Sequence, residues 1–100
     1  MQFLLIAHDA QDDAATERRM LHRDAHLANI AASKAAGNIH FGAALLDDDG
    51  KMIGSSIVAE FPTREELDAW IVADPYVTGG VWATINITPC KIAPSFAKPE

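Results

Sequence analysis

The chain has 100 residues, the size of one ordinary domain, and no linker-like segment divides it. Its net charge of −6 argues against a surface that gathers phosphates, so neither a nucleic acid nor an anionic membrane is an expected partner. The single cysteine, Cys90, cannot form an intramolecular disulfide, and the apolar start is too short for a signal peptide or a membrane span. We therefore expect one domain over residues 1–100 in a reducing cytoplasm.

The first third of the chain predicts a strand followed by a long helix. Residues 2–8 alternate as a strand does, and both of its faces are apolar. Residues 16–36 are rich in Ala, Leu, Met, Arg and Lys, which favour a helix. Gly37 is the expected C-cap, because glycine adopts the left-handed conformation at a helix end without strain.

Two further strands follow as a predicted β-hairpin. Residues 38–46 regain extended character, and the turn at 47–50 allows Gly50 to take a positive φ before a strand over residues 52–61. Both faces of this hairpin are also largely apolar. On its first strand we expect one face to hold Ile39, Phe41, Ala43 and Leu45, with Ala44 and Leu46 on the other.

A second helix and a last strand complete the pattern. Thr63 and Glu66 match a capping box, in which each side chain satisfies a free backbone N–H at the start of a helix. Pro75 should end this helix, because proline cannot continue one. Residues 81–88 alternate as a strand, and residues 89–100 are expected to form an extended C-terminal arm. The expected buried stripe of the helix is Leu67, Trp70 and Ile71.

The order βαββαβ predicts an α+β fold of the ferredoxin-like type, an antiparallel sheet with both helices on one face. The opposite sheet face is too apolar to be a fully solvated surface. A second copy of the chain would remove it from water at about 25 cal/mol per Å² of apolar area, so we expect a homodimer or a higher oligomer built from such dimers. The alternative is that the many small Ala and Gly residues lower the cost of exposure.

Asp74 departs from the pattern of its helix. It follows Leu67, Trp70 and Ile71 at a position where the stripe predicts an apolar residue. It also lies at the helix C-terminus, where the macrodipole disfavours an anion by about 0.3–1 kcal/mol, so a cationic or hydrogen-bonding partner should compensate it. The alternative is a turn in which Asp74, preceding Pro75, accepts hydrogen bonds from nearby backbone N–H groups.

His26 is the most suggestive of the four histidines. It lies mid-helix, at the edge of an apolar wedge formed by Met20, Leu27, Ile30 and Ala31. A carboxylate beside an imidazole fixes its tautomer, and imidazole is suited to acid or base catalysis near neutral pH. We therefore predict that His26 and Asp74 form a catalytic pair. The alternative is a histidine at the core boundary that serves only in packing.

Other polar residues are secondary candidates. His22 and His26 have the spacing of a helical metal pair, but no third ligand follows with diagnostic spacing, and no cofactor is expected. Tyr76 and Ser55 are candidates for substrate binding through their hydroxyls. Cys90 has no His or Cys neighbour in sequence, so we expect an inert thiol.

Two short segments carry a resemblance to a known family. Residues 23–27, Arg-Asp-Ala-His-Leu, resemble the R-x-x-H-L signature on the first helix of YciI-like (YCII-related) proteins, and residues 73–77, Ala-Asp-Pro-Tyr-Val, resemble their A-D-P-Y-V motif. The similarity covers most of residues 1–90. It implies a dimeric ferredoxin-like α+β barrel in which His26 and Asp74 form an acid–base dyad in a cleft. Some relatives eliminate chloride from hydroxylated aromatic substrates.

The leading functional hypothesis is a cofactor-independent lyase or isomerase. His26, held by Asp74, would move a proton on a small cyclic or aromatic substrate, and Arg23 would orient an anionic group of that substrate. One alternative is a non-catalytic module that binds a small molecule or serves as an accessory. A second alternative is a metal-dependent activity through His22 and His26.

Overall fold

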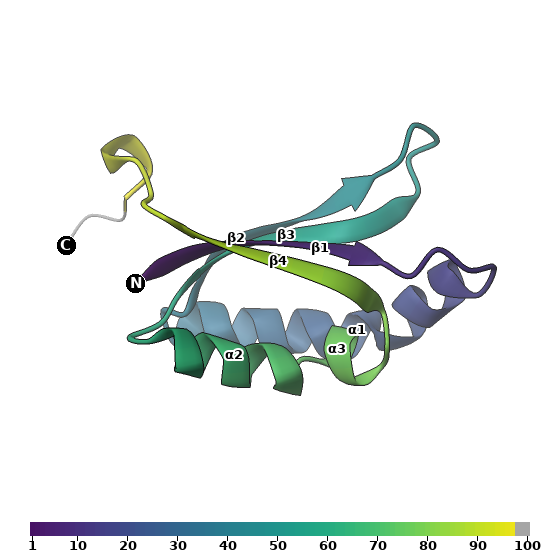
Figure 1. Ribbon diagram of the computed structural model, residues 1–100, viewed down its shortest axis with the longest axis horizontal. Helices are drawn as coiled ribbons and strands as arrows, with labels where there is room; N and C mark the ends of the chain where they lie inside the picture. The colour runs from purple at the N-terminus through teal and green to yellow at the C-terminus, as the bar shows by residue number, and fades with distance from the viewer. Residues whose placement is uncertain (98–100) are drawn as a thin grey trace.

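The computed structural model describes residues 1–97 and consists of a four-stranded sheet with its helices packed on one face (Figure 1). Each strand is antiparallel to its neighbours, in the order β2-β3-β1-β4. The predicted α+β ferredoxin-like order is confirmed, with the short helix α3 and the 3-10 turn η1 as additions. The elements are β1 (Gln2–Asp9), α1 (Ala15–Ala35), β2 (Ile39–Leu46), β3 (Met52–Glu60), α2 (Arg64–Ala73), α3 (Pro75–Thr78), β4 (Trp82–Cys90) and η1 (Pro94–Phe96).

The hydrophobic core lies between the sheet and the helices. β1 directs Phe3, Leu5 and Ala7 toward the helices, and each is at most 1% exposed. Leu67 and Ile71 of α2 pack into the same cluster, and Trp70 lies partly buried beside them. The predicted stripe of α2 is therefore confirmed. Burying these side chains is the main favourable term that holds α2 on the sheet.

The glycine signals fall where the chain needs a positive φ. Gly37 has φ +86° directly after α1, and its N–H donates to the Lys34 carbonyl at 3.0 Å. Asn38 N–H donates to the Ser33 carbonyl at 2.9 Å, which completes a Schellman-type end. Gly50 has φ +81° in the turn between β2 and β3, as predicted for the hairpin.

The ends of α2 differ from the prediction in two details. Thr63 Oγ1 accepts from Glu66 N–H at 3.2 Å, but the Glu66 carboxylate accepts from the Thr63 hydroxyl at 3.4 Å and not from the Thr63 backbone. The reciprocal capping box is thus wrong in one of its two bonds. Pro75 does more than end α2, since it is the first residue of α3, with Asp74 as the N-cap. Proline suits this position because its missing N–H would be unpaired there in any case.

The predicted faces of β2 are wrong for Ile39, because the strand contains an irregularity, whereas Phe41, Ala43 and Leu45 share one face as predicted. Ile39 pairs with Ala59, but Phe41 pairs with Val58, so the register shifts at His40. Paired residues share a sheet face, and the shift turns Phe41 away from Ile39. Ile39 is 1% exposed on the helix-covered face, whereas Phe41 is 53% exposed on the open face. The residues beyond the shift that share the open face with Phe41 are Ala43 and Leu45.

The apolar wedge predicted on α1 is mostly wrong, because only Ile30 of its four residues packs against the core. Met20 is 55% and Leu27 43% exposed, and the buried residues of the helix are instead Arg19, His26 and Ser33. These three polar residues are two helical turns apart, so they lie along one line facing the sheet. An amphipathicity argument cannot find this line, because it assumes that the inward residues are apolar.

The last strand continues beyond residue 88. Pro89 and Cys90 pair with Phe3 and Gln2, and Gln2 Oε1 accepts from the backbone N–H of Ile92 at 2.7 Å. The predicted arm over residues 89–100 thus begins as part of β4, continues through η1, and has its last residues, 98–100, outside the described part of the chain. Within residues 1–97, no helix combines the length and the apolar character needed to cross a membrane.

Candidate active site

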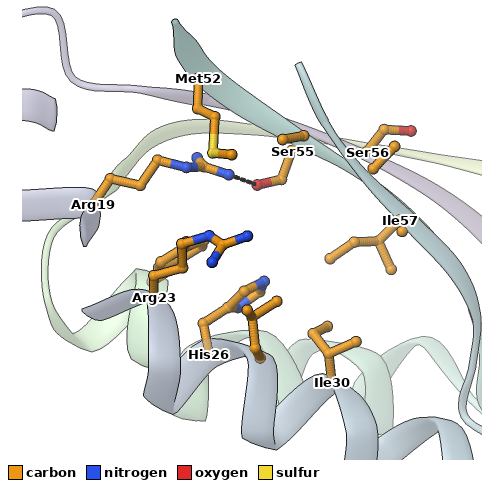
Figure 2. Close-up of a pocket in the computed structure, with 13 residues that line it drawn as sticks. Arg19, Arg23, His26, Ile30, Met52, Ser55, Ser56 and Ile57 are labelled. Atoms are coloured by element: carbon orange, nitrogen blue, oxygen red, sulfur yellow. Dashed lines mark hydrogen bonds between the residues drawn. The ribbon is translucent and has the colours of Figure 1, made fainter. Parts of the chain in front are cut away.

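A cavity of about 240 Å³ lies between α1 and the β2–β3 hairpin. Figure 2 shows Arg19, Arg23, His26 and Ile30 arranged along α1, facing Met52, Ser55 and Ile57 of β3. The volume is below the roughly 300–1,000 Å³ of sites for drug-sized ligands, so it suits a small molecule. Its wall combines three basic or imidazole side chains with apolar ones, and Tyr76 contributes from α3.

His26 and Asp74 come together although they are far apart in the sequence. His26 Nδ1 lies 2.8 Å from Asp74 Oδ2, and Asp74 is 0% exposed. Asp74 Oδ1 accepts from Asn29 Nδ2 at 2.7 Å, and Oδ2 also accepts from Tyr76 N–H at 2.9 Å. Both interpretations of Asp74 therefore hold at once: it caps α3 through a turn, and its carboxylate has side-chain partners on α1.

The contact with Asp74 determines which nitrogen of His26 faces a ligand. A carboxylate can only accept, so Nδ1 carries the hydrogen and a neutral His26 has its free lone pair on Nε2. The ring is fixed by stacking on Tyr76, with centroids 3.8 Å and planes 9° apart, and by the edge of Trp82 at 5.6 Å. Since His26 lines the cavity, it can exchange a proton with a bound molecule.

Tyr76 is a buried phenol beside these charges. Burial raises the pKa of Tyr76 above its usual value of 10.0, and the nearby cations Arg19 and Arg23 act in the opposite direction. Its hydroxyl therefore remains protonated near neutral pH. Tyr76 is 1% exposed and lines the cavity. Its ring supports the stacked imidazole of His26.

A second polar network, which the sequence did not indicate, joins α1 to the sheet. Arg19 Nη1 donates to both carboxylate oxygens of Asp9, at 2.9 and 3.0 Å, and Arg19 Nη2 donates to Ser55 Oγ at 3.0 Å. Trp82 Nε1 donates to the same hydroxyl at 3.1 Å. Two spacings could have revealed it: Arg19 precedes His26 by two helical turns, and Asp9 continues the inward positions of β1.

The remaining predicted residues take different positions. Ser55 lines the cavity, but its hydroxyl accepts two internal hydrogen bonds and has only its own hydrogen left to donate. Arg23 lines the cavity and makes no ion pair with any residue in 1–97. Cys90 is a free, half-buried thiol opposite Gln2, at the other end of β1 from Asp9.

The metal interpretation of His22 and His26 finds no third ligand. In residues 1–97 no group of three or more His, Cys, Asp or Glu side chains is placed to hold an ion. His26 Nδ1 already contacts Asp74. The His22 ring packs so closely against Gly79 that a Cβ atom added at residue 79 would lie 2.5 Å from the ring. The two histidines therefore have separate surroundings.

Fold and site together place the protein among ferredoxin-like α+β domains. A family model for the YCII-related domain matches residues 1–91, and the chain belongs to this family. Protein YciI of Escherichia coli O6:H1 is 32% identical over 97 residues, which span 91% of this chain and 97% of that protein. The predicted family membership is thus confirmed.

Two solved structures show the same architecture. One is the 5-chloro-2-hydroxyhydroquinone dehydrochlorinase TftG of Burkholderia phenoliruptrix in complex with 2,5-dihydroxybenzoquinone. It matches with a TM-score of 0.79 and 26% identity over 93% of this chain and 96% of that chain. The other, Rv0793 of Mycobacterium tuberculosis, matches with a TM-score of 0.51 and 12% identity over 93% and 96%, and shows the likeness of fold alone.

Proposed function

We propose that the cavity is the active site of a cofactor-independent enzyme of the lyase or isomerase type, acting on a small cyclic or aromatic substrate. The observation that carries this proposal is the 2.8 Å contact between His26 Nδ1 and a fully buried Asp74, with His26 in the cavity wall. An imidazole oriented by a carboxylate is an effective acid–base group, because the carboxylate stabilises the imidazolium that forms during proton transfer.

The proposed chemistry needs only a proton carrier. His26 Nε2 removes a proton from the substrate, and the electron pair left behind forms a new double bond. In an elimination, the leaving group departs with its bonding pair. In an isomerisation, His26 returns the proton to another atom. The similarity to TftG, whose name describes the loss of chloride from a chlorinated hydroxyhydroquinone, supports this class of reaction.

Two substitutions of His26 test its role with matched geometry. In His26→Asn the amide nitrogen can take the place of Nδ1 beside Asp74, but nothing replaces Nε2. In His26→Gln the amide reaches toward the Nε2 position without a basic nitrogen. Both variants should remain folded and lose turnover on hydroxylated or chlorohydroxylated aromatics and lactones, by roughly 10²–10⁴-fold in kcat for an acid–base group. Full activity of a folded His26→Asn protein would refute the proposal.

Binding without reaction is the second candidate function, and the mixed apolar and cationic cavity favours it. A thermal-shift screen followed by product analysis separates the two, because a ligand that binds the folded state raises Tm whether or not it is transformed. Stabilisation by substrates with no product would favour the binding module.

We also propose that the open sheet face pairs with the same face of a second copy. The residues that this face exposes or half-buries include Leu4, Ile6, Phe41, Ala43 and Leu45. Ile6 pairs with Ser56 on one side and Asn86 on the other, so it lies well inside the sheet. Ile6→Lys should convert a dimer to a monomer in light scattering, whereas Leu21→Lys, on the exposed side of α1, should not. A monomeric wild-type protein would contradict the pairing.

A further inference from the structure

The charges around the cavity do not cancel. Arg19 is neutralised by Asp9 at 2.9 Å, and His26 is paired with Asp74. Arg23 lines the same cavity and has no carboxylate within ion-pair distance among residues 1–97. A cation on the wall of a partly apolar cavity attracts an anion more strongly than one in bulk water, because the local dielectric constant is lower. The unpaired positive charge of Arg23 contrasts with the net charge of −6 of the whole chain.

Arg19 lines the same cavity, but its side chain is already engaged by neighbouring residues. It is 4% exposed, and its guanidinium contacts both carboxylate oxygens of Asp9 and the hydroxyl of Ser55. It also lies over the face of the Tyr76 ring, 4.7 Å from the centroid. Its Nε is buried and makes no hydrogen bond to any residue in 1–97. Because this atom has almost no accessible surface, Arg19 supports the cavity wall, and Arg23 is the cation that a ligand in the cavity can reach.

We propose that Arg23 forms an anion subsite, with Arg19 fixing the cavity wall beside it, and that the ligand is a small ring acid bound as its anion through a phenolate, enolate or carboxylate oxygen. Figure 2 shows both arginine side chains extending from α1 toward β3, with His26 one turn beyond Arg23. The apolar wall from Leu27, Ile30 and Ile57 would cover the ring. The inference rests on the proposed function, since it places the charged oxygen beside the carbon on which His26 acts.

The subsite has a chemical consequence for that reaction. When His26 removes a proton from a ring carbon, the electron pair spreads onto a conjugated oxygen. When His26 protonates a ring carbon, an anionic oxygen supplies the electron density. In both directions the charge on the oxygen changes during the step, and a fixed cation beside it stabilises the more highly charged state.

Isothermal titration calorimetry with two rings of similar size tests the subsite. 2,5-Dihydroxybenzoquinone is a vinylogous acid and is ionised at neutral pH, whereas hydroquinone is neutral. The wild-type protein should bind the anion at least about tenfold more tightly than the neutral ring. Arg23→Gln should weaken binding of the anion by about tenfold or more and leave hydroquinone binding within about twofold.

One further variant controls for indirect effects. Arg18→Gln removes a cation from the same helix that pairs with Asp12 outside the cavity, and should leave both affinities unchanged. The Tm of each variant is measured alongside, so that a loss of fold is not mistaken for a loss of binding.

Equal affinity of the wild-type protein for the two rings, failure to bind either, or equal loss of both in Arg23→Gln would overturn the subsite. Turnover is measured separately, so that the two proposals can fail independently. Selective anion binding without turnover of any ring supports the subsite and removes the enzyme. Turnover of a neutral ring that Arg23→Gln leaves unchanged supports the enzyme and removes the subsite.

Discussion

The imidazole of His26 lies flat on the ring of Tyr76, with the ring centroids 3.8 Å apart. Asp74 is bonded to both residues, to His26 through Nδ1 and to Tyr76 through the backbone N–H. One buried carboxylate at the α2–α3 junction therefore fixes both the imidazole and the platform beneath it. This arrangement restricts His26 to one orientation, which is a requirement for efficient proton transfer.

The stack predicts different outcomes for two substitutions of Tyr76. Tyr76→Phe retains the ring under His26, so the free energy of unfolding should change by less than about 1.5 kcal/mol. Tyr76→Ala removes a core aromatic side chain and should cost about 3–5 kcal/mol. Urea denaturation measures both. If the two variants were equally unstable, the hydroxyl and not the ring would be the stabilising part of Tyr76.

Asp74→Asn should destabilise the fold even though the two side chains have nearly the same shape. The amide nitrogen of Asn must face either His26 Nδ1–H or Asn29 Nδ2, both of which donate to the carboxylate. An unmatched buried donor costs about 1–3 kcal/mol. Asp68→Asn is the control, because Asp68 pairs with Arg64 on the exposed side of α2 and should change stability by less than about 0.5 kcal/mol. Equal effects of the two substitutions in urea denaturation would contradict the assignment.

The ion pair between His40 and Glu60 predicts an acid-dependent contribution to stability. The hydrogen bond from His40, 2.6 Å from the Glu60 carboxylate, lowers the pKa of Glu60 below its usual value of 4.5, with Gln2 as the second cause. The folded state therefore binds fewer protons than the unfolded chain in this range. The contribution is fully present above pH 4.5 and is lost as the pH falls through the folded-state pKa.

Glu60→Gln tests this contribution. The Glu60 side chain is 43% exposed, so solvent screening limits the effect to roughly 0.2–1 kcal/mol near pH 6. The difference from wild type should shrink toward zero well below pH 4.5. Asp48→Asn, in the exposed turn after β2, should show no such trend. A difference between wild type and Glu60→Gln that stays constant with pH would exclude the carboxylate as its source.

The sequence predicted the order of elements, because periodicity, turn glycines and caps act over a few residues and leave local patterns. It did not predict the irregularity at His40, which places Phe41 and Ile39 on opposite faces of the sheet and depends on pairing with β3. It also did not predict the buried line of Arg19, His26 and Ser33, since an apolar-inward pattern cannot describe a helix whose inner face is polar.

The candidate site was predictable only in part. Asp74 stood out because it broke an apolar stripe, and the resemblance in residues 23–27 and 73–77 connected it with His26. The pairing of Arg19 with Asp9 left only the weak spacing signals described above, because the two residues lie on different elements and charged residues of either type are usually exposed. Contacts between elements that combine polar side chains are set by the tertiary fold and not by local propensity.

The Arg19–Asp9 pair gives the sharpest stability prediction, because both side chains are about 5% exposed. Arg19→Met leaves Asp9 as an unpaired buried charge and should cost about 3–5 kcal/mol. The double variant Arg19→Met with Asp9→Leu removes both charges, so it should be more stable than Arg19→Met alone. A double-mutant cycle in urea separates this coupling from lost packing. If the double variant lost the sum of the two single losses, the residues would be energetically independent and the buried ion pair would not stabilise the junction of β1 and α1.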